Sequence, residues 1–101
     1  MDIAKSPVFH MFYAHHPIAI TCDSGATSSL IRYSLAVKLG MDILNTTHTA
    51  SQADGKTKMT IRGEVHVTFT RNDMKFLLEA IAVEELDCEV LAGVPFMKKM
   101  P

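Results

Sequence analysis

One acidic residue, Asp23, lies in a stretch whose residue types and spacing suit chemistry on a carboxylate. The mainly apolar residues 18–22 precede Asp23, and Ser24-Gly25-Ala26-Thr27 follows it. Small residues let the backbone fold tightly, and hydroxyl groups can donate to a carboxylate without filling the space in front of it. The same pattern is also ordinary Asp-Ser-Gly turn chemistry. Alone, it leaves an open acidic site and a simple turn as alternatives.

The other reactive side chains favour no rival chemistry. Cys22 adjoins Asp23, but no signature of a thiol protease surrounds it, and strand alternation turns it inward with Ile18 and Ile20. The nearby serines lack the G-x-S-x-G pattern of serine hydrolases. Neither the five histidines nor the two cysteines follow zinc-site spacings. We therefore expect no metal and no cofactor, and we expect Cys22 and Cys88 to be reduced, buried thiols.

Length and composition limit the possible classes of protein. A chain of 101 residues suits one domain, so we expect residues 1–101 to form a single unit and not a two-lobed enzyme. With 48% hydrophobic and 21% charged residues, disorder is excluded. A formal net charge of -1 without a basic run argues against direct nucleic-acid binding. No apolar stretch approaches the roughly 20 residues of a membrane span, and we expect a soluble, unsecreted protein.

Apolar periodicity predicts a mostly β chain with little helix. Every second residue of 64–70 is apolar, which predicts a strand with one buried face. After a polar turn at 71–73, residues 75–83 are apolar on both faces and predict the more central strand of a hairpin. Only two segments favour helix: residues 34–39, with Gly40 as the stop, and a short segment beginning at Pro95.

Two more hairpins are expected. Residues 8–13 and 18–22 are rich in β-forming side chains, and Ala14-His15-His16-Pro17 separates them, where the proline marks a turn or a strand edge. Residues 46–62 are polar and reverse direction at Asp54-Gly55, so they predict a hairpin that can stand out from the body of the domain.

A further motif near the C-terminus gives the Asp23 stretch a context. Residues 89–93 read Glu-Val-Leu-Ala-Gly, an apolar strand ending in glycine before the short helix. Together with residues 23–28 and the Asp54-Gly55 tip, in this order and spacing, they make residues 8–100 resemble the retropepsin-like aspartic proteases, especially those of gypsy-type LTR retrotransposon polyproteins. The resemblance implies an all-β, closed-barrel-like protomer with a flap hairpin and one or two short helices, excised from a larger polyprotein.

The resemblance also implies a role for each matched residue. Asp23 would be the catalytic aspartate, half of a dyad that the same residue of a second chain completes. Ser24 would brace the two active-site loops, while Leu91 and Gly93 would support them from behind. The residues in contact with substrate would be Gly25, Ala26, Thr27, Ile31 and Leu91, with Ala53, Asp54 and Gly55 at the flap tip.

The implied activity is that of a homodimeric aspartic endopeptidase. Two carboxylates about 3 Å apart share one proton, so one can activate a water as base while the other acts as acid. The expected partners are a second copy of the chain and a peptide, physiologically the element's own polyprotein. The expected location is intracellular, in the cytoplasm or within virus-like particles.

Three departures from the family pattern keep other functions open. Ala92 replaces a larger aliphatic residue, and Val94 and Thr27 replace an arginine and its acidic partner in viral members. Eight residues follow Gly93 in this sequence, so we expect no C-terminal strand of the kind that many viral dimers have. The alternatives are a cellular retropepsin-like protease and a catalytically weak or inactive dimerisation or peptide-binding module of the same fold.

Overall fold

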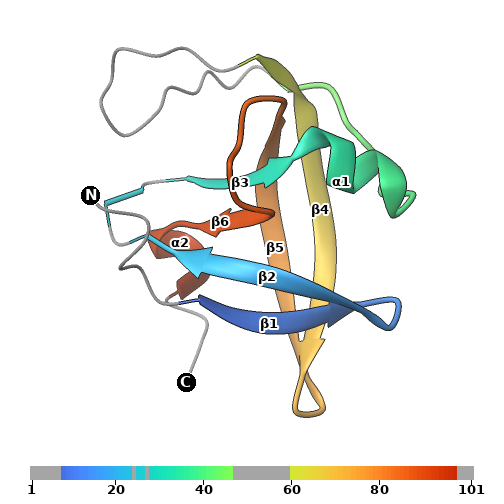
Figure 1. Cartoon of the computed structure of the whole chain (residues 1–101), viewed down its shortest axis with the longest axis vertical. Helices are drawn as coiled ribbons and strands as arrows, with labels where there is room; N and C mark the ends of the chain where they lie inside the picture. The colour runs from blue at the N-terminus through green and yellow to red at the C-terminus, as the bar shows by residue number, and fades with distance from the viewer. Residues whose placement is uncertain (1–7, 24, 27, 47–59, 98–101) are drawn as a thin grey trace.

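The strands of the chain close into a barrel (Figure 1). The computed structural model describes residues 8–23, 25–26, 28–46 and 60–97. Its elements, in chain order, are β1 (Val8–Tyr13), β2 (His16–Cys22), β3 (Ser29–Arg32), α1 (Tyr33–Lys38), β4 (Ile61–Arg71), β5 (Met74–Val83), β6 (Val90–Ala92) and α2 (Val94–Met97). Around the barrel the order is β1-β2-β6-β3-β5-β4. The prediction of an all-β, closed-barrel-like fold is confirmed.

The hairpin of β4 and β5 is the longest in the barrel, and its sequence pattern explains its position. Val65, Val67 and Phe69 are buried, while the residues between them on β4 are exposed or half-buried. The two strands turn at Asn72 and Asp73, which both have positive φ, as a two-residue hairpin turn requires. On their other sides, β5 pairs with β3 at four positions and β4 with β1 at the single pair Phe12–Thr70, so β5 is the more fully paired strand of the hairpin.

The hairpin of β1 and β2 is tighter than expected. Its turn consists of Ala14 and His15, with φ of 47° and 69°, and β2 begins at His16. The turn therefore takes two of the four residues between the expected strands, and His16 and Pro17 belong to β2. Pro17 pairs with Phe12 inside the ladder, and it is tolerated there because β6 reaches only Ile20–Cys22 on the other side of β2.

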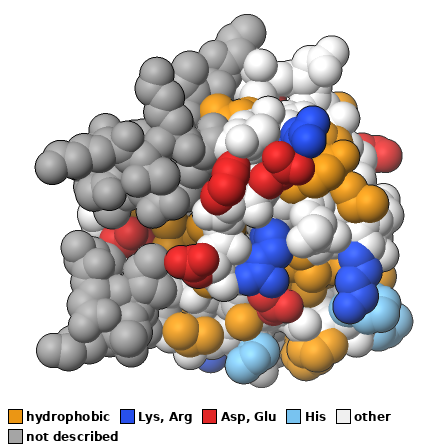
Figure 2. All heavy atoms as spheres, turned by 45° about the horizontal axis from the view of Figure 1, so that its top comes forward, with side chains coloured by type: hydrophobic (Ala, Val, Ile, Leu, Met, Phe, Trp, Pro, Cys, Tyr) orange, Lys and Arg blue, Asp and Glu red, His pale blue; other side chains and the backbone are white. Residues whose placement is uncertain are grey.

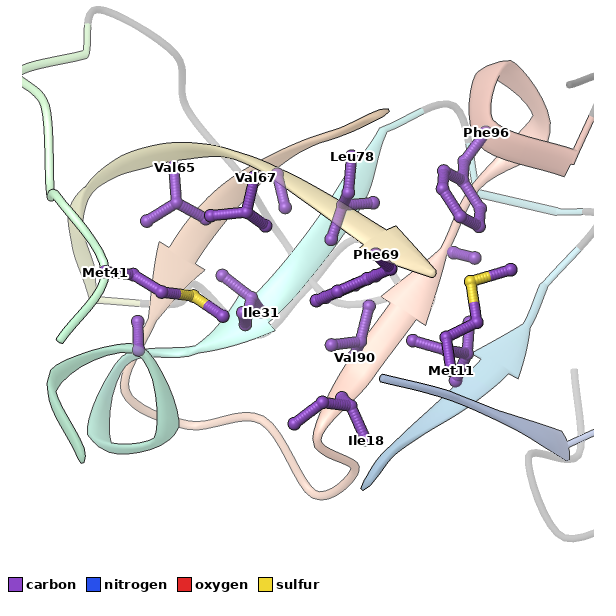
Figure 3. Close-up of a cluster of buried hydrophobic side chains, with 14 of the residues drawn as sticks. Met11, Ile18, Ile31, Met41, Val65, Val67, Phe69, Leu78, Val90 and Phe96 are labelled. Carbon is purple, nitrogen blue, oxygen red and sulfur yellow. The ribbon is translucent and has the colours of Figure 1, made fainter. Parts of the chain in front are cut away.

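Apolar side chains pack in two groups on opposite sides of β3, β5 and β6. The barrel core is filled by every strand and both helices, and Figure 3 labels Met11, Ile18, Ile31, Met41, Val65, Val67, Phe69, Leu78, Val90 and Phe96 within it. The other group, here called the second apolar cluster, consists of Leu30, Ile81, Val83, Leu86 and Leu91. Alternate residues of a strand face opposite ways, so these three strands supply both groups.

The two helices are short and close to their predicted positions. Ala36 of α1 is fully buried, and Gly40 follows the helix with φ of 71°, a conformation that favours glycine. In α2, Phe96 packs edge-on against Phe76 of β5 with ring centroids 6.4 Å apart. Among the described residues, neither helix has the length and hydropathy that a membrane span needs.

Candidate active site

Three neighbouring strands fix the position of Asp23. β6 pairs in parallel with β2, where Thr21 lies opposite Leu91 and Cys22 opposite Ala92, and β6 pairs with β3 on its other edge. The backbone N–H of Asp23 donates to the carbonyl of Ala92 at 2.9 Å, which extends the parallel pairing by one residue. Strand β2 therefore ends beside the end of β6 (Figure 1), and Asp23 directly follows β2.

The turn after β2 orients the carboxylate of Asp23. The backbone N–H of Gly25 donates to Oδ1 of Asp23 at 2.8 Å, and the N–H of Ala26 donates to the carbonyl of Asp23 at 3.1 Å. Only 4% of Asp23 is exposed. Small residues make this geometry possible, because a Cβ on Gly25 would lie 3.3 Å from Oδ1 of Asp23. An oriented, buried carboxylate of this kind can take up or release a proton at a fixed place.

Gly93 supports this turn from behind by very close contact. A Cβ on Gly93 would lie 2.8 Å from the carbonyl oxygen of Ser28 and 2.9 Å from that of Ala26. The backbone N–H of Val94 donates to the carbonyl of Ala26 at 3.0 Å, so the chain after β6 is bonded directly to the turn of Asp23. The structure thus places Gly93 directly against the turn that follows Asp23, and its role in supporting an active-site loop stays a prediction.

Ser29 is a supporting residue that the sequence did not indicate. Its Oγ accepts a hydrogen bond of 3.0 Å from the buried N–H of Gly93. The two residues lie 64 positions apart, and no local pattern marks a serine at the start of a strand as the partner of a distant glycine. Only the tertiary contact assigns it this role.

Replacing Ser29 with alanine should lower the free energy of unfolding by about 1–3 kcal/mol. The reason is that the N–H of Gly93 would remain buried without an acceptor. Chemical denaturation measures the change, with Ser34→Ala as the control, because Ser34 is exposed on α1. An equal, small effect of both substitutions would show that the Ser29 bond does not support the site.

The substrate-contacting residues predicted from sequence do not all share one face. Leu91 lies in the second apolar cluster, Ala26 packs against that cluster, and Gly25 is exposed beside Asp23. Ile31 instead lies fully buried in the barrel core, because it has the opposite parity to Leu30, which packs with Leu91. Ile31 therefore lies on the other face of β3 from Leu91, and Leu30 is the β3 residue that packs with Leu91.

Five of the predicted site residues lie outside the described part of the chain. They are Ser24, Thr27, Ala53, Asp54 and Gly55, and their roles at the active-site loop and the flap tip stay predictions.

The two cysteines are free thiols, as predicted, but they are half-buried and not buried. Burial raises the pKa of the Cys22 thiol above its ordinary value. Burial also raises the pKa of Cys88, and a hydrogen bond with the Thr21 side chain opposes that effect. A raised pKa reduces the thiolate fraction, which disfavours Cys22 as a nucleophile beside Asp23. Within the described ranges, no three His, Cys, Asp or Glu side chains gather as metal ligands would.

Comparisons with known proteins agree on the fold. No protein-family model and no curated protein matches this sequence. The retroviral protease-like domain of Ddi1 from Leishmania major superposes with a TM-score of 0.73 at 14% identity, covering 94% of this chain and 75% of that one. EIAV protease complexed with the inhibitor HBY-793 superposes with a TM-score of 0.76 at 12% identity, covering 99% of this chain and 92% of that one. A retropepsin-like aspartic protease from Rickettsia conorii superposes with a TM-score of 0.68 at 22% identity, covering 91% of this chain and 70% of that one. The chain therefore has the retropepsin fold, with Asp23 at the end of the parallel strands β2 and β6.

Proposed function

We propose that this chain is one half of a homodimeric aspartic endopeptidase in which Asp23 of each copy forms the catalytic dyad. The observation that carries the proposal is the buried, backbone-oriented carboxylate of Asp23 in a retropepsin fold. Among the described residues, Asp23 is the one buried acidic side chain. Acid–base hydrolysis by two carboxylates therefore takes its second carboxylate from a second copy.

The proposed mechanism uses the two carboxylates in opposite protonation states. Like charges a few ångströms apart disfavour double ionisation, so the pair holds one proton between them. The ionised member takes a proton from a water, whose oxygen bonds to the peptide carbonyl carbon. The carbon–nitrogen bond then breaks as the leaving nitrogen receives a proton from the dyad. Water is consumed, two peptide ends are released, and no covalent enzyme intermediate forms.

The proposed substrate is an extended peptide within a polyprotein. The second apolar cluster lies beside the turn of Asp23 through Ala26 and Leu91, so it favours apolar peptide side chains near the cleaved bond. We propose a retrotransposon or retroviral-type polyprotein as the source, in the cytoplasm or within virus-like particles. The similar structures include EIAV protease, a domain of a Leishmania protein and a Rickettsia protein, so they favour neither a mobile element nor a cellular protease.

Cleavage of a random peptide library at about pH 4–6, read by mass spectrometry, tests this function. We expect cleavage at peptide bonds flanked by apolar residues and saturable binding of a statine inhibitor in calorimetry. A sample shown to be dimeric that neither cleaves peptides nor binds the statine would contradict the proposal. That result would favour the non-catalytic dimerisation or peptide-binding module.

A further inference from the structure

The connection between β5 and β6 crosses the end of β3. In the barrel, β3 lies between β6 and β5, and residues 84–89 join these two strands. In Figure 1 the connection passes across β3, and the last residue of β3, Arg32, is bonded to it. Arg32 also lies opposite Val83 in the ladder with β5, so its backbone lies beside the residue at which the connection begins.

Arg32 donates hydrogen bonds to three carbonyl groups of this connection. Its Nε donates to Leu86 at 3.0 Å, its Nη2 to Asp87 at 2.6 Å, and its backbone N–H to Glu89 at 2.9 Å. The planar guanidinium group presents several donors in a fixed arrangement, whereas a lysine ammonium is a point charge on a flexible stem. The two side-chain bonds therefore fix the middle of the connection, which no strand pairing holds.

Acidic side chains hold the two ends of the connection. Both carboxylate oxygens of Glu85 accept from the backbone N–H of Thr60 at 2.7 and 2.8 Å, and Glu84 forms an ion pair of 2.9 Å with Arg62. At the other end, Glu89 accepts from the N–H of Ala19 at 2.8 Å. Charged side chains of both signs lie close together on the face shown in Figure 2. Because both ends of the connection are bonded in this way, the side-chain bonds of Arg32 fix the position of Leu86 and Asp87 between them.

The middle of the connection carries Leu86 into the second apolar cluster. Leu86 is 8% exposed and belongs to the same cluster as Leu30 and Leu91, against which Ala26 packs. Ala26 is bonded through its N–H to the carbonyl of Asp23. The position of Leu86 thus sets the packing of the apolar side chains that lie beside the candidate catalytic turn.

We propose that Arg32 is a positioning residue for substrate selectivity. By holding the carbonyl groups of Leu86 and Asp87, it fixes Leu86 where an apolar side chain of the peptide substrate packs against it and Leu91. The inference rests on the proposed function for its substrate, but the hold of Arg32 on the connection stands on the hydrogen bonds alone. It predicts a defect in peptide selectivity without a defect in the chemistry at Asp23.

The reactivity of Cys88 measures the position of the connection without any assay of activity. Cys88 lies in the connection and is half-buried. In a Cys22→Ser background, Arg32→Met should speed labelling of Cys88 by a neutral thiol reagent about tenfold, because the middle of the connection opens more often. Loss of the Arg32 charge would itself raise the pKa of Cys88 and slow labelling, so faster labelling reports exposure. Arg32→Lys should fall between Arg32→Met and wild type.

Arg71→Met is the matched control, because it removes the same guanidinium group at the distant β4–β5 turn, where Arg71 lies over the ring of Phe9 at 5.0 Å. We expect its labelling rate to equal that of wild type. With peptides carrying apolar side chains, Arg32→Met should raise KM about tenfold, leave kcat within about twofold, and reduce the preference for large over small apolar residues. Arg32→Lys should restore part of that preference.

The possible outcomes separate this inference from the proposed function. Unchanged Cys88 labelling in Arg32→Met overturns the positioning role whether or not the protein is a protease. Faster labelling with unchanged KM and preference overturns the role in selectivity. A wild-type dimer without Asp23-dependent cleavage overturns the proposed function, and the role of Arg32 in selectivity with it. The labelling rates of Cys88 would still show whether Arg32 holds the connection in place.

Discussion

Replacing Asp23 with asparagine should reduce peptide cleavage at least about a thousandfold while leaving the fold intact. An amide neither takes a proton from water nor gives one to a leaving nitrogen, so both roles of the dyad are lost. Asparagine keeps an oxygen in the place of Oδ1, which can still accept from the N–H of Gly25. In a dimer it also removes the repulsion between two carboxylates. Initial rates on a cleaved peptide and thermal unfolding together measure both effects.

Asp23→Ala separates the catalytic from the structural contribution of the same side chain. The Asp23→Ala variant should be as inactive as Asp23→Asn. Its free energy of unfolding should be lower by about 1 kcal/mol, because the backbone N–H of Gly25 loses its acceptor. If Asp23→Asn in a dimeric sample cleaves peptides at the wild-type rate, the reaction takes place at another site and the proposed dyad is wrong.

Replacing Gly93 with alanine should lower the free energy of unfolding by about 3 kcal/mol and abolish cleavage. The added Cβ would stand 2.8 and 2.9 Å from the carbonyl oxygens of Ser28 and Ala26, which are backbone atoms that no rotamer change can move. The turn after Asp23 must therefore shift, and with it the hydrogen bonds that Gly93 and Val94 donate. Urea denaturation measures the stability, and the peptide assay measures the site.

Gly40→Ala provides the comparison for a glycine without such contacts. Gly40 has φ of 71° but open space around it, so alanine there should cost about 1 kcal/mol through backbone strain alone. If Gly93→Ala is no less stable than Gly40→Ala, and is still active, then the close approach of the two chain segments is not what holds the turn.

The strands of this fold could be predicted from sequence where one face meets water. The alternation in residues 64–70 gave β4 the correct buried face, because Val65, Val67 and Phe69 point into the barrel and their neighbours do not. The same logic predicted β5 as central and α1 within one residue of its observed bounds. Local chemistry also indicated a tight turn of small residues around Asp23 after a buried strand, but it did not separate an acidic site from a simple turn.

The remaining features depend on contacts that no local pattern contains. β3 is buried on both faces, so its sequence does not say which of Leu30 and Ile31 faces Leu91, and the structure shows that it is Leu30. Ser29 and Arg32 act on partners 54 to 64 positions away. Their roles follow from the order of strands in the barrel, in which β6 passes between β2 and β3.

The central claim is that one chain holds half of an active site, and the most direct test is the dependence of specific activity on protein concentration. The dimer fraction is measured by sedimentation equilibrium on the same samples. Activity per mole of chain should rise in proportion to the dimer fraction and vanish on dilution to monomer. Constant activity per mole across concentrations at which the protein is monomeric would contradict this claim.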